Sequence, residues 1–166
     1  MIERVATRKG KIGIFAVAHG VYWEQFPGLL DSMMGYHHKL CSKIAANDVE
    51  VLDFGMIDSS EKAYEAAQRI QASGVDLLFT NMITYATSSV FAPILRASNV
   101  PIVLVALQPR KAMDYTQANT FMQLENDNIC SVPEFTCVAE RFGKPVSDII
   151  LGTLDDDPQA DKELAD

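Results

Sequence analysis

Seven polar or aromatic side chains could contact a small molecule, because each lies at or just after the end of a short apolar run. These residues are His19, Tyr22, Trp23, Asn81, Thr84, Tyr85 and Gln108. Aromatic rings with scattered amide and hydroxyl groups suit a neutral, polyhydroxylated ligand such as a sugar, which presents both C–H faces and hydroxyls. The alternative is that the tyrosine and tryptophan rings cap the core with their polar tips satisfied. His19 is favoured for ligand contact because it directly follows the first apolar run.

The turn after the first apolar run argues against a phosphate-bearing cofactor. Residues 19–26 read His-Gly-Val-Tyr-Trp-Glu-Gln-Phe, with a single glycine. A flavin or dinucleotide site needs a turn rich in Gly or Ser/Thr, whose backbone N–H groups cradle phosphate. A response regulator needs acidic residues after the first strand and an Asp at the end of the third, where this chain has Ala18 and Met82. Neither class of protein is expected.

Other reactive side chains do not combine into a catalytic or metal site in the sequence. His37 and His38 are neighbours, and neighbours on a helix point about 100° apart, so they cannot both bind one ion without other ligands. We expect both to face solvent or an interface. Cys130 precedes a predicted helix, but no base can be placed beside it, so a nucleophilic thiol is the minority interpretation. The chain is predicted to be a binding domain without its own catalytic centre.

Five short apolar runs predict the strands that position these side chains. They cover residues 12–18, 49–54, 76–82, 101–107 and 148–154, with helical segments at about 26–47, 58–73, 87–98 and 131–143 between them. This alternation predicts an α/β fold, a flavodoxin-like three-layer sandwich whose five-stranded parallel sheet has the order 2-1-3-4-5. Ligands of such sheets bind beyond the carboxyl ends of the strands, at the switch point between strands one and three. That rule selects the loops that start at His19 and Asn81.

Three local signals predict where helices begin. Asp58-x-x-Glu61 and Ser131-x-x-Glu134 have the capping-box pattern, in which the first side chain and the acid three residues later bond reciprocally to free backbone N–H groups. Pro93 lies inside the segment 87–98, where it either bends the helix or marks its true start.

Charge and cysteine content restrict the partners. The chain has 166 residues, a formal net charge of -8 and no cluster of Lys and Arg, so nucleic acids and anionic membranes are not expected as partners. No apolar stretch approaches the roughly 20 residues that span a bilayer. The residues before Ile12 lack a signal-type apolar region. Three cysteines without C-x-x-C spacing argue against a disulfide framework. A cytoplasmic location is expected.

The acidic C-terminal segment predicts the start of a helix. Asp155-Asp156-Asp157-Pro158 places acids at the cap and Pro at the first helical position. Six acidic residues and one Lys give residues 154–166 a net charge of -5, which leaves -3 for the rest. We therefore expect residues 1–154 to form one domain, and residues 155–166 to begin a helix that continues in a longer multi-domain chain.

Four segments carry a resemblance to a known family. They are His19-Gly-Val-Tyr22, Met82-Ile-Thr-Tyr-Ala86, Ile102-Val-Leu-Val-Ala-Leu-Gln108, and Phe121-Met-Gln-Leu-Glu-Asn126 followed by Glu134-Phe135. In this order they resemble the N-terminal domain of L-arabinose isomerase and its L-fucose isomerase-like relatives. The resemblance covers most of the chain, although each motif is short.

The resemblance implies the function of the whole family. Its members are three-domain aldose–ketose isomerases, usually homo-hexamers, that move a proton through an enediol with a divalent ion of the Mn(II) type. Their metal ligands belong to the central and C-terminal domains, and their N-terminal domain reaches into the active site of a neighbouring subunit. The implied role of this chain is to cover the substrate and form the oligomer, with no catalytic residue and no bound cofactor of its own.

The resemblance also implies a set of substrate-binding residues. They are His19, Val21, Tyr22, Tyr85, Gln108, Asn126 and Cys130. Tyr22 matches the family, whereas His19 stands where the family has Gln, Tyr85 where it has Phe, and Cys130 where it has His. These differences leave the sugar open. The alternatives are a stand-alone flavodoxin-like module that binds sugar or regulates, and a flavin-binding domain.

Overall fold

Five parallel strands form a single sheet in a computed structural model that describes residues 8–166. The strands are β1 (Lys11–Val17), β2 (Glu50–Ile57), β3 (Leu77–Met82), β4 (Ile102–Gln108) and β5 (Asp148–Thr153). Their order is β2-β1-β3-β4-β5, which confirms the predicted flavodoxin-like topology. The ends of the strands differ from the predicted ones by no more than three residues. Residues 1–7, which belong to the segment before Ile12 considered for a signal sequence, lie outside the described residues.

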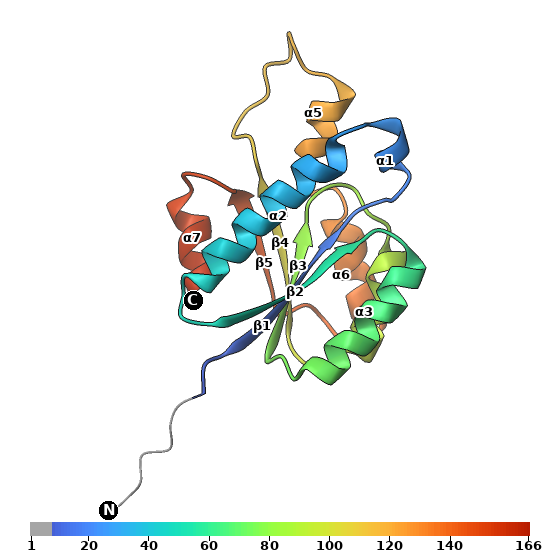
Figure 1. Ribbon diagram of the computed structural model, residues 1–166, viewed down its shortest axis with the longest axis vertical. Coiled ribbons are helices and arrows are strands. Elements are labelled where there is room, and N and C mark those ends of the chain that lie inside the picture. Colours follow the sequence, from blue (N-terminus) through green and yellow to red (C-terminus); the bar gives the residue numbers. More distant parts are fainter. Residues whose placement is uncertain (1–7) are drawn as a thin grey trace, which may run out of the picture.

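Helices cover both faces of the sheet and complete the three layers (Figure 1). They are α1 (Tyr22–Gln25), α2 (Leu29–Ala45), α3 (Ser60–Ser73), the 3-10 helix η1 (Ser88–Val90), α4 (Ala92–Ala97), α5 (Thr120–Glu125), α6 (Val132–Arg141) and α7 (Pro158–Ala165). Helices α2 and α7 pack on one face, and α3, α4 and α6 pack on the other. Among residues 8–166, no helix combines the length and the apolar character that a bilayer crossing requires.

The centre of the sheet is buried on both faces, as the continuous apolar runs predict. Residues 14–17 of β1 are completely inaccessible to solvent. At Gly13 a Cβ atom would lie 2.6 Å from Leu78 and 2.9 Å from Phe54, so only glycine fits between these side chains. This tight packing holds the carboxyl end of β1 in a fixed position, where the loop that contains His19 begins.

Helices α3 and α6 begin close to the predicted residues, but the predicted capping hydrogen bonds are not the ones observed. Helix α3 is capped by Ser59, whose hydroxyl accepts from the Lys62 N–H, so the capping box predicted at Asp58 is off by one residue. Helix α6 begins after Ser131, but the Ser131 hydroxyl bonds to Ala86 instead of capping the helix. A tertiary contact therefore uses the Ser131 hydroxyl, which the local sequence pattern had assigned to a helix cap.

Two predicted helices are shorter than their segments. Pro93 marks the start of α4, and the preceding residues form η1, so the predicted helix over 87–98 is two separate elements. Helix α2 starts at Leu29, after Gly28 in a left-handed conformation with φ 85°.

At the C-terminal end, Asp157 caps α7 through the Ala160 N–H, as predicted from its acidic start.

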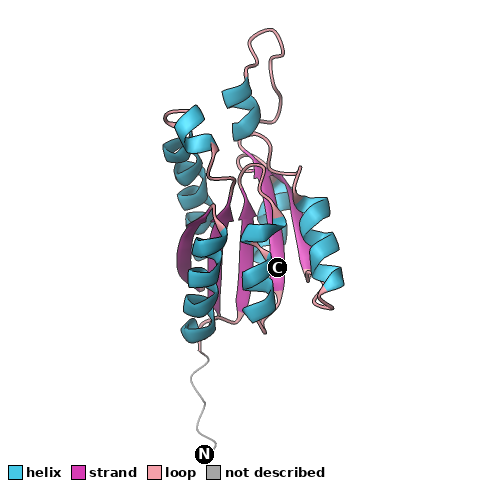
Figure 2. Ribbon diagram, turned by 90° about the vertical axis from the view of Figure 1, so that its right-hand side faces the viewer, coloured by secondary structure: helices cyan, strands magenta, loops and turns pink. Residues whose placement is uncertain are grey.

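Two short helices that the sequence analysis did not predict lie at the carboxyl end of the sheet. Helices α1 and α5 pack against α2 there, and the loop between β4 and α5 extends above them (Figures 1 and 2). Their contact is a small apolar cluster that includes Leu29, Met33 and Leu124. Because this cluster joins the neighbouring helices α1 and α2 to α5, which is far from them in the sequence, it positions the loops over the strand ends.

Candidate functional site

Three aromatic rings meet at the switch point between β1 and β3. The His19 ring lies edge-on to Tyr22 with centroids 5.7 Å apart, and its centroid is 6.4 Å from that of Tyr85. We call these three residues the switch-point cluster. All three are partly exposed, and among residues 8–166 the imidazole of His19 makes no hydrogen bond. Its ring nitrogens therefore remain available to a ligand.

A cavity of about 380 Å³ opens beside His19. Its lining includes backbone and side-chain atoms of His19, Gly20, Val21, Asp58, Ser59, Ser60, Thr87, Ser89 and Val90. This volume lies at the lower end of the range of ligand sites in proteins. Its lining combines an imidazole and several hydroxyls with apolar groups, a mixture that suits a small polyhydroxylated molecule.

Asp58 holds the loop that carries the cluster. Its carboxylate accepts a hydrogen bond from the Trp23 indole N–H at 2.8 Å and pairs with Lys62 at 2.7 Å, and its carbonyl accepts from the Gly20 N–H at 3.2 Å. The polar atom of Trp23 is therefore used within the protein. For Trp23 the structure supports the alternative in which the ring caps the core.

Gln108 and Asn126 also make hydrogen bonds within the protein. The Gln108 amide donates to the Asn126 carbonyl at 2.7 Å, and the Asn126 side chain accepts from the Arg110 N–H at 3.0 Å. These bonds join the end of β4 to the C-terminal end of α5. A ligand that used either amide would have to compete with these bonds.

A buried carboxylate fixes α5 against α2. Glu125 is 5% exposed and accepts hydrogen bonds from the hydroxyls of Ser32 and Tyr36, the latter at 3.3 Å. Its second oxygen pairs with Arg110 at 3.0 Å. Two hydroxyls of α2 and the guanidinium of Arg110 thus converge on one carboxylate of α5, which positions the loop from Asn126 to Cys130.

Tyr22 and Cys130 both keep their protons at neutral pH. Burial raises the pKa of the Tyr22 phenol, and the charges of Asp127 and Cys130 raise it further. Burial and a hydrogen bond to Asp127 raise the pKa of Cys130 to about 11. The Cys130 thiol donates to the Asp127 carbonyl at 3.1 Å. Both groups therefore act as hydrogen-bond donors, and neither is an activated nucleophile.

Two residues predicted to point into the crevice are buried instead. Asn81 is 4% exposed, and its amide lies 3.1 Å from His37 Nδ1, on the face of the sheet covered by α2. Thr84 is fully buried, and its hydroxyl has no hydrogen-bond partner in the described part of the chain. The prediction that both face a ligand is wrong. Asn81 lies on β3 and, by the alternation of a strand, turns to the face that α2 covers, whereas Thr84 lies in the buried segment two residues after the end of β3.

The prediction that His37 faces solvent or an interface is also wrong. Its ring is completely buried between α2 and the sheet, and its Nε2–H donates to Asp53 Oδ1 at 2.9 Å. Since a carboxylate only accepts, Nε2 carries the proton and Nδ1 accepts from the Asn81 amide. We call His37, Asn81 and Asp53 the His37 network. His38, by contrast, is exposed as expected.

The His37 network holds Asp53 as a carboxylate. Burial raises the pKa of Asp53, but the hydrogen bonds from His37 and from the Gly55 N–H outweigh it, so that its pKa lies below the ordinary value. One sequence signal places Cys41 beside His37. His37 and Cys41 are four residues apart, which places them on one face of a helix. Nothing in the sequence indicated that Asp53 faces them.

No protein-family model and no curated protein matches this chain. What the site can do therefore follows from its residues. The switch-point cluster offers an imidazole, two phenols and nearby hydroxyls, which suit binding and orientation. Within residues 8–166, the carboxyl end of the sheet holds no group of three His, Cys, Asp or Glu side chains close enough to share an ion.

Proposed function

We propose that this chain is the substrate-covering and oligomer-forming domain of a cytoplasmic, metal-dependent aldose–ketose isomerase similar to L-arabinose isomerase. The switch-point cluster is the observation that carries the proposal. It places an imidazole that makes no hydrogen bond within residues 8–166 beside a cavity, with two phenol rings next to that imidazole, at the end of the sheet where ligands of this fold bind. The segments that resemble the isomerase family include all three of these residues.

The cluster suits an uncharged sugar. The rings of Tyr22 and Tyr85 offer apolar faces to its C–H groups, while their hydroxyls and the His19 nitrogens exchange hydrogen bonds with its hydroxyls. The hydroxyls of Thr87 and Ser89 lie along the same cavity. Because Tyr22 keeps its proton, it donates to the sugar and does not abstract a proton from it. In this proposal the chain's residues bind and orient the substrate and exclude water.

A divalent metal ion, Mn(II) in the proposal, would supply Lewis-acid polarisation of the substrate. The switch-point cluster does not fit the role of its ligand set, because phenols and one imidazole without a converging carboxylate are a poor site for a hard ion. We therefore assign the catalytic ion to other domains of the enzyme.

Two exposed apolar side chains lie next to proposed substrate-binding residues in the sequence and favour a subunit contact there. Val21 is 49% exposed beside Tyr22, and Ile129 is 42% exposed beside Cys130. Apolar groups next to a polar site are typical of surfaces that another protein covers. In the proposal the neighbouring subunit of a hexamer covers this rim and brings the metal-bearing part of its own chain to the sugar.

Sugar binding can be tested directly on the 166-residue chain. Two-dimensional amide NMR spectra recorded during titration with L-arabinose, L-fucose and D-glucose should show shifts at residues 19–22, 85 and 87–89. The variant His19→Ala should need about two- to tenfold more sugar to reach the same shifts, and His38→Ala, at an exposed histidine on α2, should titrate like the unchanged protein. Shifts spread evenly over the surface, or an unchanged titration of His19→Ala, would contradict the proposed site.

Catalysis needs a second assay. With Mn(II) and an aldopentose, we expect ketose to form with the natural gene product that contains this chain and not with the 166-residue chain alone. Turnover by the 166 residues would place catalysis here and contradict the proposal. Sugar binding without turnover by the gene product would instead support a stand-alone sugar-binding or regulatory module.

A further inference from the structure

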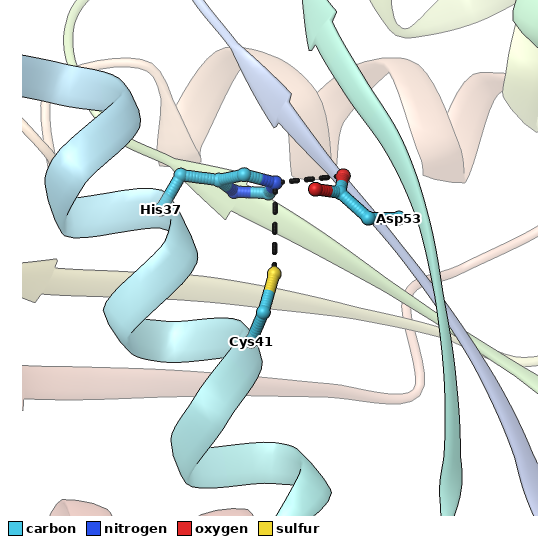
Figure 3. Close-up of side chains that lie close together, drawn as sticks. All are labelled: His37, Cys41 and Asp53. Atoms are coloured by element: carbon cyan, nitrogen blue, oxygen red, sulfur yellow. Dashed lines mark hydrogen bonds and ion pairs between the residues drawn. The ribbon is translucent and has the colours of Figure 1, made fainter. Parts of the chain in front are cut away.

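Three metal-binding side chains converge where helix α2 crosses the edge strand β2 (Figure 3). His37 and Cys41 lie one turn apart on α2, and Asp53 lies on β2. The Nε2 atom of His37 is 2.9 Å from Asp53 Oδ1 and 3.7 Å from Cys41 Sγ. All three donor atoms lie within 4.8 Å of one another. This is the one such group among residues 8–166.

One of these separations matches an edge of a tetrahedral zinc site, and the other is about 0.5 Å shorter than such an edge. With bonds of about 2.3 Å to sulfur and about 2.0 to 2.1 Å to nitrogen and oxygen, tetrahedral ligands lie about 3.6 Å apart for the N and S pair and about 3.4 Å for the N and O pair. The observed values are 3.7 Å and 2.9 Å. A movement of roughly 0.5 Å by the Asp53 carboxylate, the most exposed of the three groups, would open the space for an ion.

The backbone of β2 is shaped to present Asp53 to the helix. The pairing of β1 with β2 shifts register here, so that one additional residue is inserted on β2 between the partners of Ile14 and Ala16. Gly55 adopts φ 81° in this bulge, and its N–H donates to Asp53 Oδ1 at 2.7 Å. Bulges re-aim side chains, and here the bulge holds the carboxylate beside His37.

We propose that His37, Cys41 and Asp53 bind a zinc ion that ties α2 to the edge of the sheet. The three side chains fill three tetrahedral positions, and a water molecule fills the fourth from the solvent side, where the Asp53 side chain is 34% exposed. The proposal concerns a site on this chain's own residues and does not depend on the isomerase function.

The protons balance with one change of tautomer. Zinc replaces the hydrogen on His37 Nε2, which moves to Nδ1, and the Cys41 thiol releases its proton to solvent. The Asn81 amide then turns so that its oxygen accepts from Nδ1–H in place of the present donation. A buried amide oxygen in this position orients the imidazole, as the outer partners of metal-binding histidines do.

The donor set selects zinc over the harder ions. Thiolate and imidazole ligands favour Zn(II), whereas Mn(II) and Mg(II) prefer sets made mainly of oxygen. The ion proposed here therefore differs in kind from the Mn(II) of the proposed isomerase, which would bind elsewhere. Loading the chain with Mn(II) is expected to leave this site empty.

Cobalt(II) absorption tests the ligand set, because a thiolate bound to Co(II) gives an intense near-ultraviolet charge-transfer band. The starting protein is Cys130→Ser/Cys137→Ser, which removes the two exposed thiols. Titration with CoCl₂ should produce the band together with visible bands of a tetrahedral ion, and ZnCl₂ should abolish both. A further Cys41→Ser change should remove the charge-transfer band, and Asp53→Asn should weaken Zn(II) binding by at least about tenfold.

The matched control is His38→Gln, at the exposed neighbour of His37, which should leave the Co(II) spectrum unchanged. Cys41→Ser is nearly isosteric, and far-ultraviolet circular dichroism checks that it folds. An identical Co(II) spectrum with and without Cys41 would overturn the proposal, as would a protein with Cys41, His37 and Asp53 intact that gives no charge-transfer band.

Thermal unfolding provides a readout that does not depend on cobalt. An ion that binds only the folded chain raises its melting temperature, by an amount that corresponds to about 2.7 kcal/mol at 100 times the dissociation constant. ZnCl₂ should raise the melting temperature of Cys130→Ser/Cys137→Ser but not that of the same protein with Cys41→Ser. An equal shift in both proteins would place the zinc at other residues.

Discussion

Two histidines of this chain have opposite environments. His19, in the switch-point cluster, is partly exposed and surrounded by aromatic edges, with no hydrogen bond to its ring in the described residues. His37 is completely buried, and both of its ring nitrogens are hydrogen-bonded. The free nitrogens of His19 suit a transient ligand. The occupied nitrogens of His37 either stabilise the fold as they are or hold an ion in place of one proton.

This difference shows how the fold divides its polar groups. The His37 network lies on one face of the sheet, in the middle of strand β2, where a donor without a partner would be costly. The switch-point cluster lies beyond the strand ends, where loops meet solvent and binding groups need no partner within the protein. Substitutions in the first region should therefore change stability, and those in the second should change binding.

The largest effect is expected from His37→Ala. It leaves a cavity under α2 and removes the partner of the buried Asn81 amide, so we expect a loss of about 3 kcal/mol in the free energy of unfolding. Urea denaturation followed by circular dichroism measures it. His38→Ala removes the same side chain from the exposed side of the helix and should cost less than about 0.5 kcal/mol. Similar losses in both variants would show that burial of His37 does not stabilise the protein.

The next largest effect should come from Glu125→Ala at the carboxyl end. Glu125 is 5% exposed and accepts from Ser32, Tyr36 and Arg110. Without it two hydroxyls lose their acceptor, while the half-exposed Arg110 recovers water, so we expect a loss of about 2 kcal/mol. The exposed Glu140→Ala on α6 is the control in the same urea experiment. A loss below about 0.5 kcal/mol would mean that the end of the molecule near the ligand site has no buried anchor.

Most of the fold was predictable because strand and helix patterns are local. Each strand was indicated by a continuous apolar run, and the order of the sheet followed from the alternation with helices. The helices α1 and α5, which have four and six residues, were missed because such short elements depend on tertiary contacts more than on pattern. The caps were misassigned for the same reason, since Ser131 bonds across to Ala86.

The candidate site was predictable only where a residue's position along its own strand decides its environment. His19 and Tyr85 follow the ends of β1 and β3, and the structure brings them together. Asn81 is one residue before the end of β3, and the alternation of the strand turns it to the core, a distinction that requires the exact strand end. The partnership of His37 with Asp53 depends on a bulge in β2, which no local pattern indicated.

A smaller effect on stability is expected from His19→Ala, which sharpens the contrast between the two histidines. Its ring makes no hydrogen bond in the described chain, so its removal should change the free energy of unfolding by less than about 0.5 kcal/mol. Loss of one or two hydrogen bonds to a sugar should weaken binding by about two- to tenfold. Urea denaturation and calorimetric titration with the sugar identified by NMR measure the two quantities. A destabilisation as large as that of His37→Ala would remove the contrast.

The smallest perturbation is a chemical probe of Cys130, which needs no substitution. Its pKa of about 11 means that roughly one thiol in a thousand is ionised at pH 8, and only the thiolate is alkylated. We expect its alkylation by iodoacetamide, followed by mass spectrometry of the peptides, to accelerate about tenfold per pH unit up to pH 10. Cys137, exposed on α6, serves as the internal reference in each sample and should react first at pH 8. If Cys130 reacts as fast as Cys137 at pH 8, the Cys130 thiol is activated. The proposed sugar site would then be a centre of covalent chemistry and not a surface that only binds.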